Sequence, residues 1–458
     1  MAFNSIGFII FFISTLLIIA IIDHFTSDTR IRNIALLFIS LLFYALFNTL
    51  YLLLLLFVIL YTYFFARIIK EKTYPLVVSI IISILILFIF KYCNFFIGSF
   101  SSILHINNPV VVNLILPVGI SFYLFKSISY LVDIKRGKID VENDSVVVAL
   151  YLSFFPEIVA GPISRFSDLF VQFKNKIKIN RKDLSIGLQI FLIGLFKKIV
   201  LADNIAVFVN EVYRAPKIYS SATIVLCIIA YSFQIYLDFS GYSDMAIGCS
   251  RMLGYDIKRN FNMPYLSHNV TEFWKRWHIS LSSWLQDYLY IPLGGNRRGK
   301  CRQYINLIVT MVIGGLWHGS SWTFVLWGLV NGIALVIHKM FIKNRNRKES
   351  GILSILTTFI FISLVWVLFR ASDLQNALDL YSSIFNSKGI NYIHLNSIVC
   401  ILICVATMIF SYIKTKSEAT YILHDLNTIK GLVFVILLIG IIVGFAYTGS
   451  NPFIYASF

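Results

Sequence analysis

Apolar residues run along this chain in long blocks, and polar residues gather in short segments between them. A helix that crosses the hydrocarbon core of a bilayer needs about 17–25 mostly apolar residues. Blocks of that length, or close to it, lie at about residues 6–22, 31–47, 50–68, 75–93, 114–132, 185–201, 219–238, 322–338, 352–369, 396–413 and 431–447. The pattern therefore predicts an all-α polytopic membrane protein with about 11–12 transmembrane helices.

Composition supports the same fold class. The 458 residues are 58% hydrophobic and only 13% charged, and a water-soluble fold of this length could not cover so much apolar surface. The net charge of +17 is typical of a membrane protein whose cytoplasmic loops face anionic lipid, so it does not indicate nucleic-acid binding. We expect one membrane-embedded domain over residues 1–458.

The short loops between the blocks predict orientation. Lys and Arg occur in loops 67–74 and 133–145, whereas segment 94–113 between them has neither. Because basic loops stay in the cytoplasm, the N-terminus is expected outside. Block 6–22 has no basic n-region and no small-residue cleavage site, so it is expected to be a retained helix. We expect a multi-pass membrane protein.

Segment 146–163 is apolar but does not suit a simple crossing. A basic loop precedes it, and six Lys or Arg follow within residues 164–184, so both ends favour the cytoplasm. Pro156, Gly161 and Pro162 interrupt the helix. Irregular backbone at membrane depth is tolerated only where protein or a wet cavity surrounds it. The segment is therefore predicted to be re-entrant, beside an internal cavity.

Several ionisable residues lie within or beside the apolar blocks. A charge that faces lipid costs a few kcal/mol, so we expect these side chains to face a polar interior. The alternative is that Lys197 and Lys198 extend outward to the membrane interface and that Asp238 only hydrogen-bonds to a neighbouring helix. On residues 241–253, Asp244 and Arg251 are expected to form a structural pair. The set comprises Lys126, Glu157, Lys197, Lys198, Asp238 and Asp244.

The stretch 269–319 combines amphipathic and polar features that suit lipid poorly. Asn269, followed three residues later by Glu272, predicts a capping box at a helix start. A helical apolar stripe then predicts a helix with one buried face, lying along a membrane surface or a cavity. Pro292, Gly294 and Gly295 end it. The stripe comprises Leu281, Trp284, Leu285, Tyr288 and Leu289.

A basic loop follows the Gly-Gly turn. It is a candidate site for a polyphosphate or for anionic lipid, because four cations lie within six residues. The alternative is that the loop only anchors the cytoplasmic side of the membrane. The four residues are Arg297, Arg298, Lys300 and Arg302.

Residues 303–338 are predicted to form a hairpin, because basic segments occur at both ends. Thirteen helical residues, 304–316, rise roughly 20 Å, less than the roughly 30 Å hydrocarbon core. His318 is therefore expected at a helical tip within the membrane. Gly314, Gly315 and Gly319 allow another backbone or a substrate to approach it closely.

Two Trp-His pairs, Trp317-His318 and Trp277-His278, bracket the amphipathic stretch. Histidine is the side chain best suited to accept a proton near neutral pH, so His318 is a candidate general base and His278 a second candidate. Taken alone, either histidine could instead be structural. No third ligand completes a metal pattern around them, and the six cysteines show no metal spacing. We expect no metal.

Long motifs in the chain resemble the membrane-bound O-acyltransferase family, especially its bacterial branch of alginate and peptidoglycan O-acetyltransferase membrane subunits. The resemblance covers most of residues 114–342, the motif-bearing core, and the tail 451–458, where Ala456-Ser457 replaces the Phe-Gln of the family. The motifs include YLDFSGYSDMAIGCSRMLGYDIKRNFNMPY, FWKRWHISLSSWL, YLYIPLGGNRRG and GLWHGSSWTFVLWG.

The resemblance implies an acyl-CoA-dependent transferase, built as a ring of helices around a through-membrane tunnel. His318 matches the catalytic histidine of the family, and His278 matches its second histidine. We expect acetyl transfer from cytoplasmic acetyl-CoA toward a hydroxyl of an extracytoplasmic surface polysaccharide or of peptidoglycan, with no bound cofactor. Because a polymer cannot thread the tunnel, a separate extracytoplasmic O-acetyltransferase is the expected partner. The alternative is a carrier or flippase without acyl-transfer chemistry.

Tyr455 in the aromatic tail is an acyl-acceptor candidate. Counting crossings from an outside N-terminus places this tail at the outer side of the membrane. A phenolic oxygen can form an ester with an activated acyl group, so Tyr455 could hold acetyl between His318 and the partner enzyme. The alternative is an interfacial anchor, a role that Phe453 and Phe458 would share.

Overall fold

The computed structural model describes residues 2–106, 111–342, 351–386, 388–415, 423–449, 451 and 453–454. Within these ranges the chain is helical, with an isolated β-bridge between Tyr219 and Ile390. The all-α prediction is therefore confirmed. The chain forms two compact units: residues 1–191 with 245–258, and residues 192–244 with 259–458. The single domain expected over residues 1–458 stays a prediction.

Seven helical stretches in the described part of the chain are long and apolar enough to cross a membrane, which confirms a multi-pass protein. Three extend ten or more residues beyond the apolar blocks within them, because helix continues past block 75–93 to Ile103, past block 185–201 to Arg214 and past block 219–238 to Met252. Shorter apolar helices cover 145–158, 395–410 and 429–445. The seven are Ile6–Phe25, Thr49–Ile68, Tyr74–Ile103, Arg181–Arg214, Ser221–Met252, Trp322–Phe341 and Ile352–Arg370.

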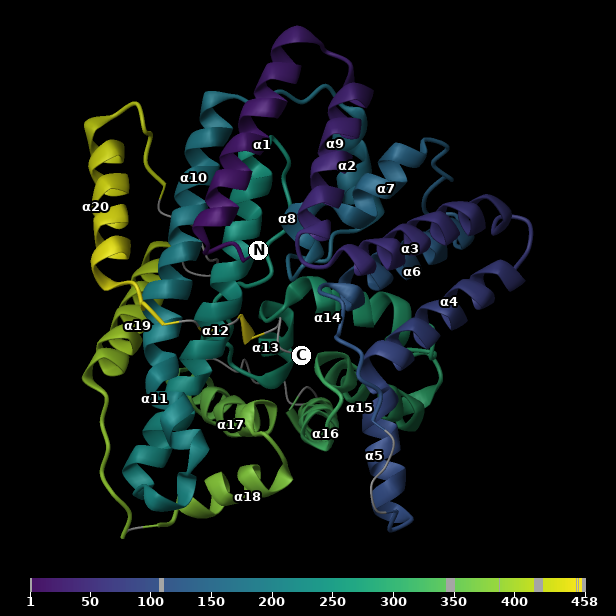
Figure 1. Cartoon of the computed structure of the whole chain (residues 1–458). Coiled ribbons are helices and arrows are strands. Elements are labelled where there is room, and N and C mark those ends of the chain that lie inside the picture. Colours follow the sequence, from purple (N-terminus) through teal and green to yellow (C-terminus); the bar gives the residue numbers. More distant parts are fainter. Residues whose placement is uncertain are drawn as a thin grey trace. The chain divides into compact units, whose positions relative to one another are not determined.

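The first unit begins with helices that start at polar caps. Ser5, Asp28 and Asn48 each accept a hydrogen bond from a backbone N–H in the first turn of the next helix. Successive helices α1 to α4 pack as neighbours, and α6 packs on α3 and α4 (Figure 1). The elements are α1 (Ile6–Phe25), α2 (Thr29–Ala45), α3 (Thr49–Ile68), α4 (Tyr74–Leu87), η1 (Phe88–Tyr92), α5 (Cys93–Ile103) and α6 (Ile120–Lys135).

Helix α6 starts later than its apolar block predicts. The block begins near residue 114, but helix begins only at Ile120. Gly119 has φ +72°, and a Cβ there would collide with the carbonyl oxygen of Ile158. The turn formed by Pro117 and Gly119 therefore delays the helix, and hydropathy alone cannot reveal that boundary.

Segment 146–163 is broken, as predicted, and is almost entirely buried. Helix α7 (Ser145–Ser153) ends before α8 (Phe155–Ile158), and α9 (Phe166–Lys174) follows after irregular backbone. Glu157 accepts hydrogen bonds from Lys126 and from the Ser164 hydroxyl. Lys126 also donates to the carbonyl oxygen of Tyr151 at 3.1 Å. The break thus lies around a buried ion pair, which confirms the inward orientation predicted for both charges.

The predicted Asp244–Arg251 pair is wrong. Helix α12 (Ser221–Met252) carries both residues, but Arg251 pairs with Asp183 of α10 (Arg181–Leu195) at 2.8 Å. Asp244 pairs with Lys197 at 2.6 Å. Seven helical positions separate Asp244 and Arg251 by about 10 Å along the axis, beyond direct contact.

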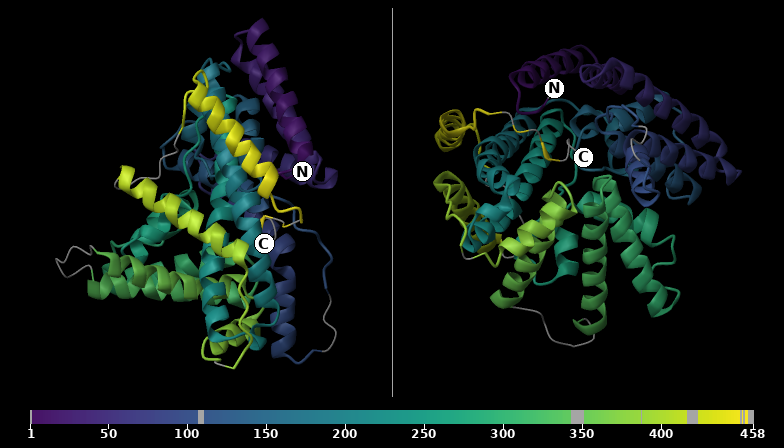
Figure 2. Two further views of the ribbon diagram at one scale, coloured as in Figure 1. Left: turned by 90° about the vertical axis from the view of Figure 1, so that its left-hand side faces the viewer. Right: turned by 60° about the horizontal axis from the view of Figure 1, so that its bottom comes forward.

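The second unit contains the rest of the chain. Helix α19 packs on α11 and η2, and α20 packs on η2. In Figures 1 and 2, α19 is the yellow-green helix and α20 is the yellow helix. The remaining elements are η2 (Phe196–Ala202), α11 (Asp203–Arg214), η3 (Pro216–Ile218), η4 (Pro264–Leu266), α13 (Val270–Arg276), α14 (Ile279–Leu285), η5 (Gln286–Tyr290), α15 (Gly299–His318), α16 (Trp322–Ile337), η6 (His338–Ile342), α17 (Ile352–Arg370), α18 (Leu374–Ser383), α19 (Leu395–Thr415) and α20 (Ile429–Phe445).

Helices α15 and α16 form the predicted hairpin, and three glycines bring their backbones together (Figure 1). A Cβ on Gly332 would lie 2.9 Å from the Cα of Ile308, and a Cβ on Gly328 would lie 2.8 Å from the Cα of Val312. A Cβ on Gly315 would likewise collide with the carbonyl oxygen of Phe324. No side chain fits at these crossing points, so glycine sets the spacing of the hairpin.

Helix α15 is longer than the sequence suggested. It begins at Gly299, inside the basic loop, and has 20 residues, which give a length of about 30 Å. The sequence placed His318 within the membrane because a helix of 13 residues is too short to cross it. The helix is longer than that, so this reason is wrong. Glycine at 299, with φ +82°, starts the helix five residues before the apolar pattern does.

Gly328→Ala is expected to destabilise the protein by about 1–3 kcal/mol, because the new methyl group collides with the backbone of α15. Gly440→Ala on α20 is the matched control, since a Cβ there meets nothing within 4 Å. The control is expected to be neutral or slightly stabilising, because alanine favours helix over glycine. Thermal unfolding in detergent measures both. Equal midpoints for the two variants would contradict close packing at Gly328.

Candidate active site

The predicted capping box begins α13, with one change of partner. The Asn269 side chain accepts from the N–H of Glu272 at 2.8 Å. The Glu272 carboxylate accepts from the N–H of His268 at 2.8 Å, one residue before the cap. Arg276 pairs with Glu272 at 2.7 Å and closes the helix. Both predicted side chains therefore satisfy N–H groups at this helix start.

A sharp break after α13 places His278. Its φ of +42° and ψ of 56° are left-handed, a conformation that is strained for a residue with a Cβ. Asn260 holds the break: its carbonyl oxygen accepts from the N–H of Ile279 at 2.9 Å, and its side-chain oxygen accepts from the Ser280 hydroxyl at 2.6 Å. Strained backbone often occurs at functional sites. Here it turns the chain so that the His278 ring is buried.

The amphipathic stripe beyond His278 is confirmed over its first three residues, whereas Tyr288 and Leu289 lie half-buried on the π-helical turn η5. Leu281, Trp284 and Leu285 are buried on one face of α14. The Leu285 side chain reaches α15, where a Cβ on Gly314 would lie 3.1 Å from its terminal carbon. Helix α14 therefore packs its buried face against the glycine-rich end of α15.

His318 is the last residue of α15, and aromatic rings surround it. The ring centroids of Trp317, Trp327 and Phe369 lie 5.0, 5.2 and 5.1 Å from its own. The side chain is buried. Because α16 supplies Trp327 and α17 supplies Phe369, the position of His318 depends on the packing of three helices.

The two histidines meet, as the sequence predicted. Their ring centroids are 6.5 Å apart, and the Trp317 ring lies 5.9 Å from that of His278. Phe239 of α12 presents an edge to His278 at 4.6 Å. We call this group the histidine chamber: His278, His318, Phe239, Trp317, Trp327 and Phe369.

Burial lowers the pKa of His278 from 6.5 to about 3, because its aromatic surroundings disfavour a charged imidazole. His278 therefore stays neutral at physiological pH and adds no positive charge beside His318. A neutral ring can position a hydroxyl or a carbonyl, but a base this weak is a poor proton acceptor. His278 is therefore better suited to positioning a reactant than to accepting its proton.

The basic loop lies at the opposite end of α15. The Gly294-Gly295 turn is held because Asn306 donates to the Gly295 carbonyl oxygen at 3.1 Å. All four predicted cations are exposed, and Lys300 and Arg302 lie in the first turn of the helix. Cations at a helix N-terminus are opposed by the helix dipole. An anion bound there would be stabilised both by the cations and by the dipole.

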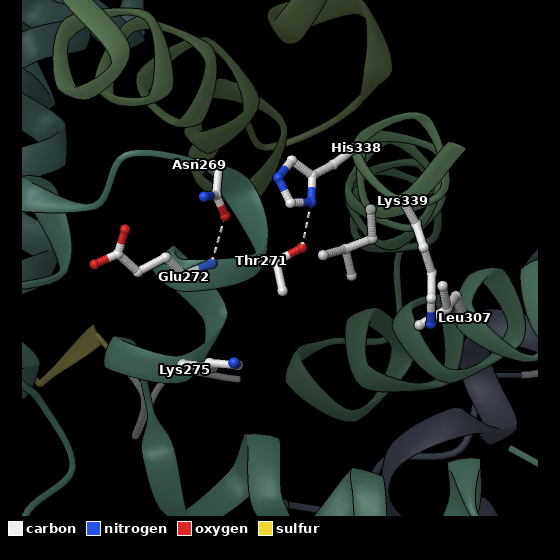
Figure 3. Close-up of a pocket in the computed structure, with 8 residues that line it drawn as sticks. Asn269, Thr271, Glu272, Lys275, Leu307, His338 and Lys339 are labelled. Atoms are coloured by element: carbon white, nitrogen blue, oxygen red, sulfur yellow. Dashed lines mark hydrogen bonds between the residues drawn. The ribbon is translucent and has the colours of Figure 1, made fainter. Parts of the chain in front are cut away.

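The sequence did not reveal a cavity of about 340 Å³ on this half of the hairpin (Figure 3). Thr271 hydrogen-bonds to the His338 ring at 2.8 Å at one side, and Lys275 and Lys339 supply two cations. Its lining residues lie up to 70 positions apart, from Asn269 to Lys339, and they come together because α16 folds back on α15 and packs on α13. The lining comprises Asn269, Thr271, Glu272, Lys275, Leu307, Leu335, His338 and Lys339.

Tyr455, the acyl-acceptor candidate, lies outside the described residues. The described part of the tail ends at Ile454, and the Phe453 side chain is buried. In the described residues, no group of three His, Cys, Asp or Glu side chains could hold a metal ion.

Comparison with known proteins gives the family. The sequence model of the membrane-bound O-acyltransferase family matches residues 144–375. The chain is 37% identical to a probable alginate O-acetylase of Pseudomonas putida, over 90% of this chain and 86% of that protein. It is 35% identical to a peptidoglycan O-acetyltransferase of Helicobacter pylori, over 100% of this chain and 96% of that protein.

A teichoic acid D-alanyltransferase of Bacillus subtilis is more distant, 28% identical over 58% of this chain and 71% of that protein. The family match includes α12 to α17 and therefore every member of the histidine chamber. Because the matches extend over most of the chain, this protein belongs to the membrane-bound O-acyltransferase family.

Proposed function

We propose that this acyltransferase takes acetyl from cytoplasmic acetyl-CoA and passes it across the bacterial cytoplasmic membrane, for O-acetylation of a cell-wall or surface polysaccharide. The observation that carries the proposal is the histidine chamber at the end of the α15–α16 hairpin. Relatives named for O-acetylation of alginate or peptidoglycan support the substrate class. Membership of an acyltransferase family disfavours the carrier alternative.

The chemistry needs one proton acceptor. The neutral imidazole of His318 takes the proton of an acceptor hydroxyl, and the oxygen attacks the thioester carbonyl carbon. The new C–O bond forms and the C–S bond breaks, so CoA leaves as a thiolate that receives the proton from His318. His278 stays neutral and orients a reactant beside it.

The hairpin separates two halves of the acyl-CoA site. The basic loop and the cavity of Figure 3 lie toward the start of α15, where cations can hold the CoA phosphates. His318 lies at the other end, 11 residues beyond Leu307, which is about 16 Å along the helix. The pantetheine arm, an extended chain, would connect the phosphates with the thioester.

The acceptor polymer is outside the cell, so a relay is required. Tyr455 is our candidate for the first acceptor, because a phenolic ester can pass its acyl group to a second enzyme. A separate extracytoplasmic O-acetyltransferase would then transfer acetyl to the polymer.

Replacement of His318 by alanine is expected to reduce acetyl transfer at least 100-fold, because general-base catalysis typically contributes 10²–10⁴-fold. The assay measures CoA release from acetyl-CoA with purified protein in the presence of acceptor. His394→Ala is the matched control, since His394 hydrogen-bonds to Ser397 at the start of α19. Retention of more than a few per cent of activity by a folded His318 variant would refute the role.

His278→Asn is expected to reduce transfer less, because asparagine tolerates the left-handed backbone and can still hydrogen-bond. Its profile of rate against pH should keep the wild-type shape between pH 6.5 and 8.5, since a group with pKa about 3 does not titrate there. The unfolded chain protonates His278 below about pH 6.5, so wild-type stability falls as pH drops through that value. Equal losses for both histidines would assign them a joint role.

Glutamine at all four basic-loop positions is expected to raise the KM for acetyl-CoA several-fold and to flatten its salt dependence, because exposed charge pairing is screened by salt. The matched control neutralises another exposed basic segment, at Lys176, Lys178, Arg181 and Lys182. An unchanged KM at low salt would leave the loop as a membrane anchor. A rise with Lys275→Met or Lys339→Met instead would place the phosphates in the cavity of Figure 3.

Tyr455→Phe is expected to abolish O-acetylation of the polymer in cells, because it keeps the aromatic ring and deletes only the hydroxyl that would carry acetyl. Measurement of polymer-bound acetate in a strain that expresses only the variant tests this. Tyr447→Phe makes the same change eight residues earlier in the chain, before the tail, and should be silent. Normal O-acetylation by the Tyr455 variant would leave Tyr455 as an interfacial anchor.

A further inference from the structure

A buried ion cluster lies beside the tail. Lys198 of η2 contacts Asp238 of α12 at 2.6 Å and Asp203 at 2.8 Å. The three side chains are at most 6% exposed. One cation thus faces two carboxylates away from water, and buried charges of this kind need further hydrogen bonds to be stable. We call Lys198, Asp203 and Asp238 the ion cluster.

The tail supplies several of those bonds. The N–H of Ile454 donates to Asp238 Oδ2 at 2.9 Å. Lys198 donates to the Asn451 carbonyl oxygen at 3.3 Å, and the Asn451 amide donates to the carbonyl oxygen of Asp203 at 3.4 Å. Each member of the ion cluster therefore bonds to the tail through its side chain or its backbone.

An aromatic contact continues from the ion cluster to the histidine chamber. Phe453 stacks on Tyr242 with centroids 4.4 Å apart, and its ring lies 5.9 Å from Phe239. Phe239 in turn makes a T-shaped contact with His278. Residue 453 is therefore one aromatic ring away from His278.

A neighbouring ion pair shows what the cluster adds. The π-helical turn of η2 directs consecutive lysines to different carboxylates of α12, Lys197 to Asp244 and Lys198 to Asp238. Lys197 and Asp244 form a second ion pair and line a separate cavity. In the ion cluster one lysine faces two carboxylates. The carboxylate of Asp238 therefore accepts a further hydrogen bond, from the N–H of Ile454. Loss of that donor leaves a buried acceptor unsatisfied, which is costly.

We propose that the ion cluster is a docking site for the tail at Asn451, Phe453 and Ile454, which it holds against the wall of the histidine chamber. Its members act as positioning residues, since they touch the tail and not the reacting atoms. The purpose of the docking rests on the proposed function, in which the tail carries acetyl from the chamber; the docking itself does not.

Thiol labelling measures the docking directly. Ile454→Cys is introduced with Cys301→Ser, which removes an exposed native thiol, and maleimide modification at position 454 is followed by mass spectrometry. Adding Asp238→Asn should raise the labelling rate at least tenfold, because the amide no longer pairs with Lys198 and holds the tail weakly. Asp244→Asn is the matched control, with the same change on the same helix. It should leave labelling unchanged.

Phe453→Ala gives a second variant that leaves the ion cluster intact, so the proposal remains testable if the Asp238 variant fails to fold. It should also raise labelling, and it should lower kcat for transfer to the acceptor while the KM for acetyl-CoA stays constant. Combining it with Asp238→Asn should add little, because both changes release the same segment.

Equal labelling in the parent, Asp238→Asn and Phe453→Ala proteins would overturn the docking site. An equal rise with Asp244→Asn would also overturn it, since a general loosening of α12 would then be the cause. Faster labelling with an unchanged kcat would refute the positioning role. If these variants behave as expected and Tyr455→Phe is fully active, the docking stands and acetyl carriage by Tyr455 fails.

Discussion

The approach of α15 to α16 is the constraint on which the active site depends. Glycines at the crossing points let the backbones touch, and no other residue fits there without displacing a main-chain atom. This contact places His318, at the end of α15, against Trp327 of α16. It also folds the end of α16 back toward the basic start of α15, which creates the cationic cavity. One packing interaction thus positions both His318 and the cavity that carries Lys275 and Lys339.

Strain and burial complete the chamber. The left-handed backbone at His278 turns its ring inward, and Asn260 compensates with hydrogen bonds to both residues that follow. Burial then keeps His278 neutral, so a second histidine can lie 6.5 Å from the base without electrostatic repulsion. The arrangement suits proton transfer by one imidazole and positioning by the other.

Features that depend on local pattern could be predicted from the sequence. The apolar blocks, the cap at Asn269 and the burial of Lys126 with Glu157 follow from hydropathy, capping chemistry and the cost of charge in lipid. The meeting of His278 and His318 came from long motifs. Features set by tertiary geometry could not be predicted: the partners of Lys197 and Lys198 depend on a π-helical turn, and the cavity depends on the hairpin. The late start of α6 depends on a close contact at Gly119.

Transfer of acetyl is the central claim, and reconstitution with acetyl-labelled acetyl-CoA tests it most directly. Purified protein in proteoliposomes receives labelled acetyl-CoA on the side of the basic loop and an acceptor polysaccharide with the partner transferase on the other. The account predicts that CoA is released on the first side and that label becomes covalently bound to protein and then to acceptor. Passage of unmodified substrate through the membrane, with the thioester intact, would contradict it.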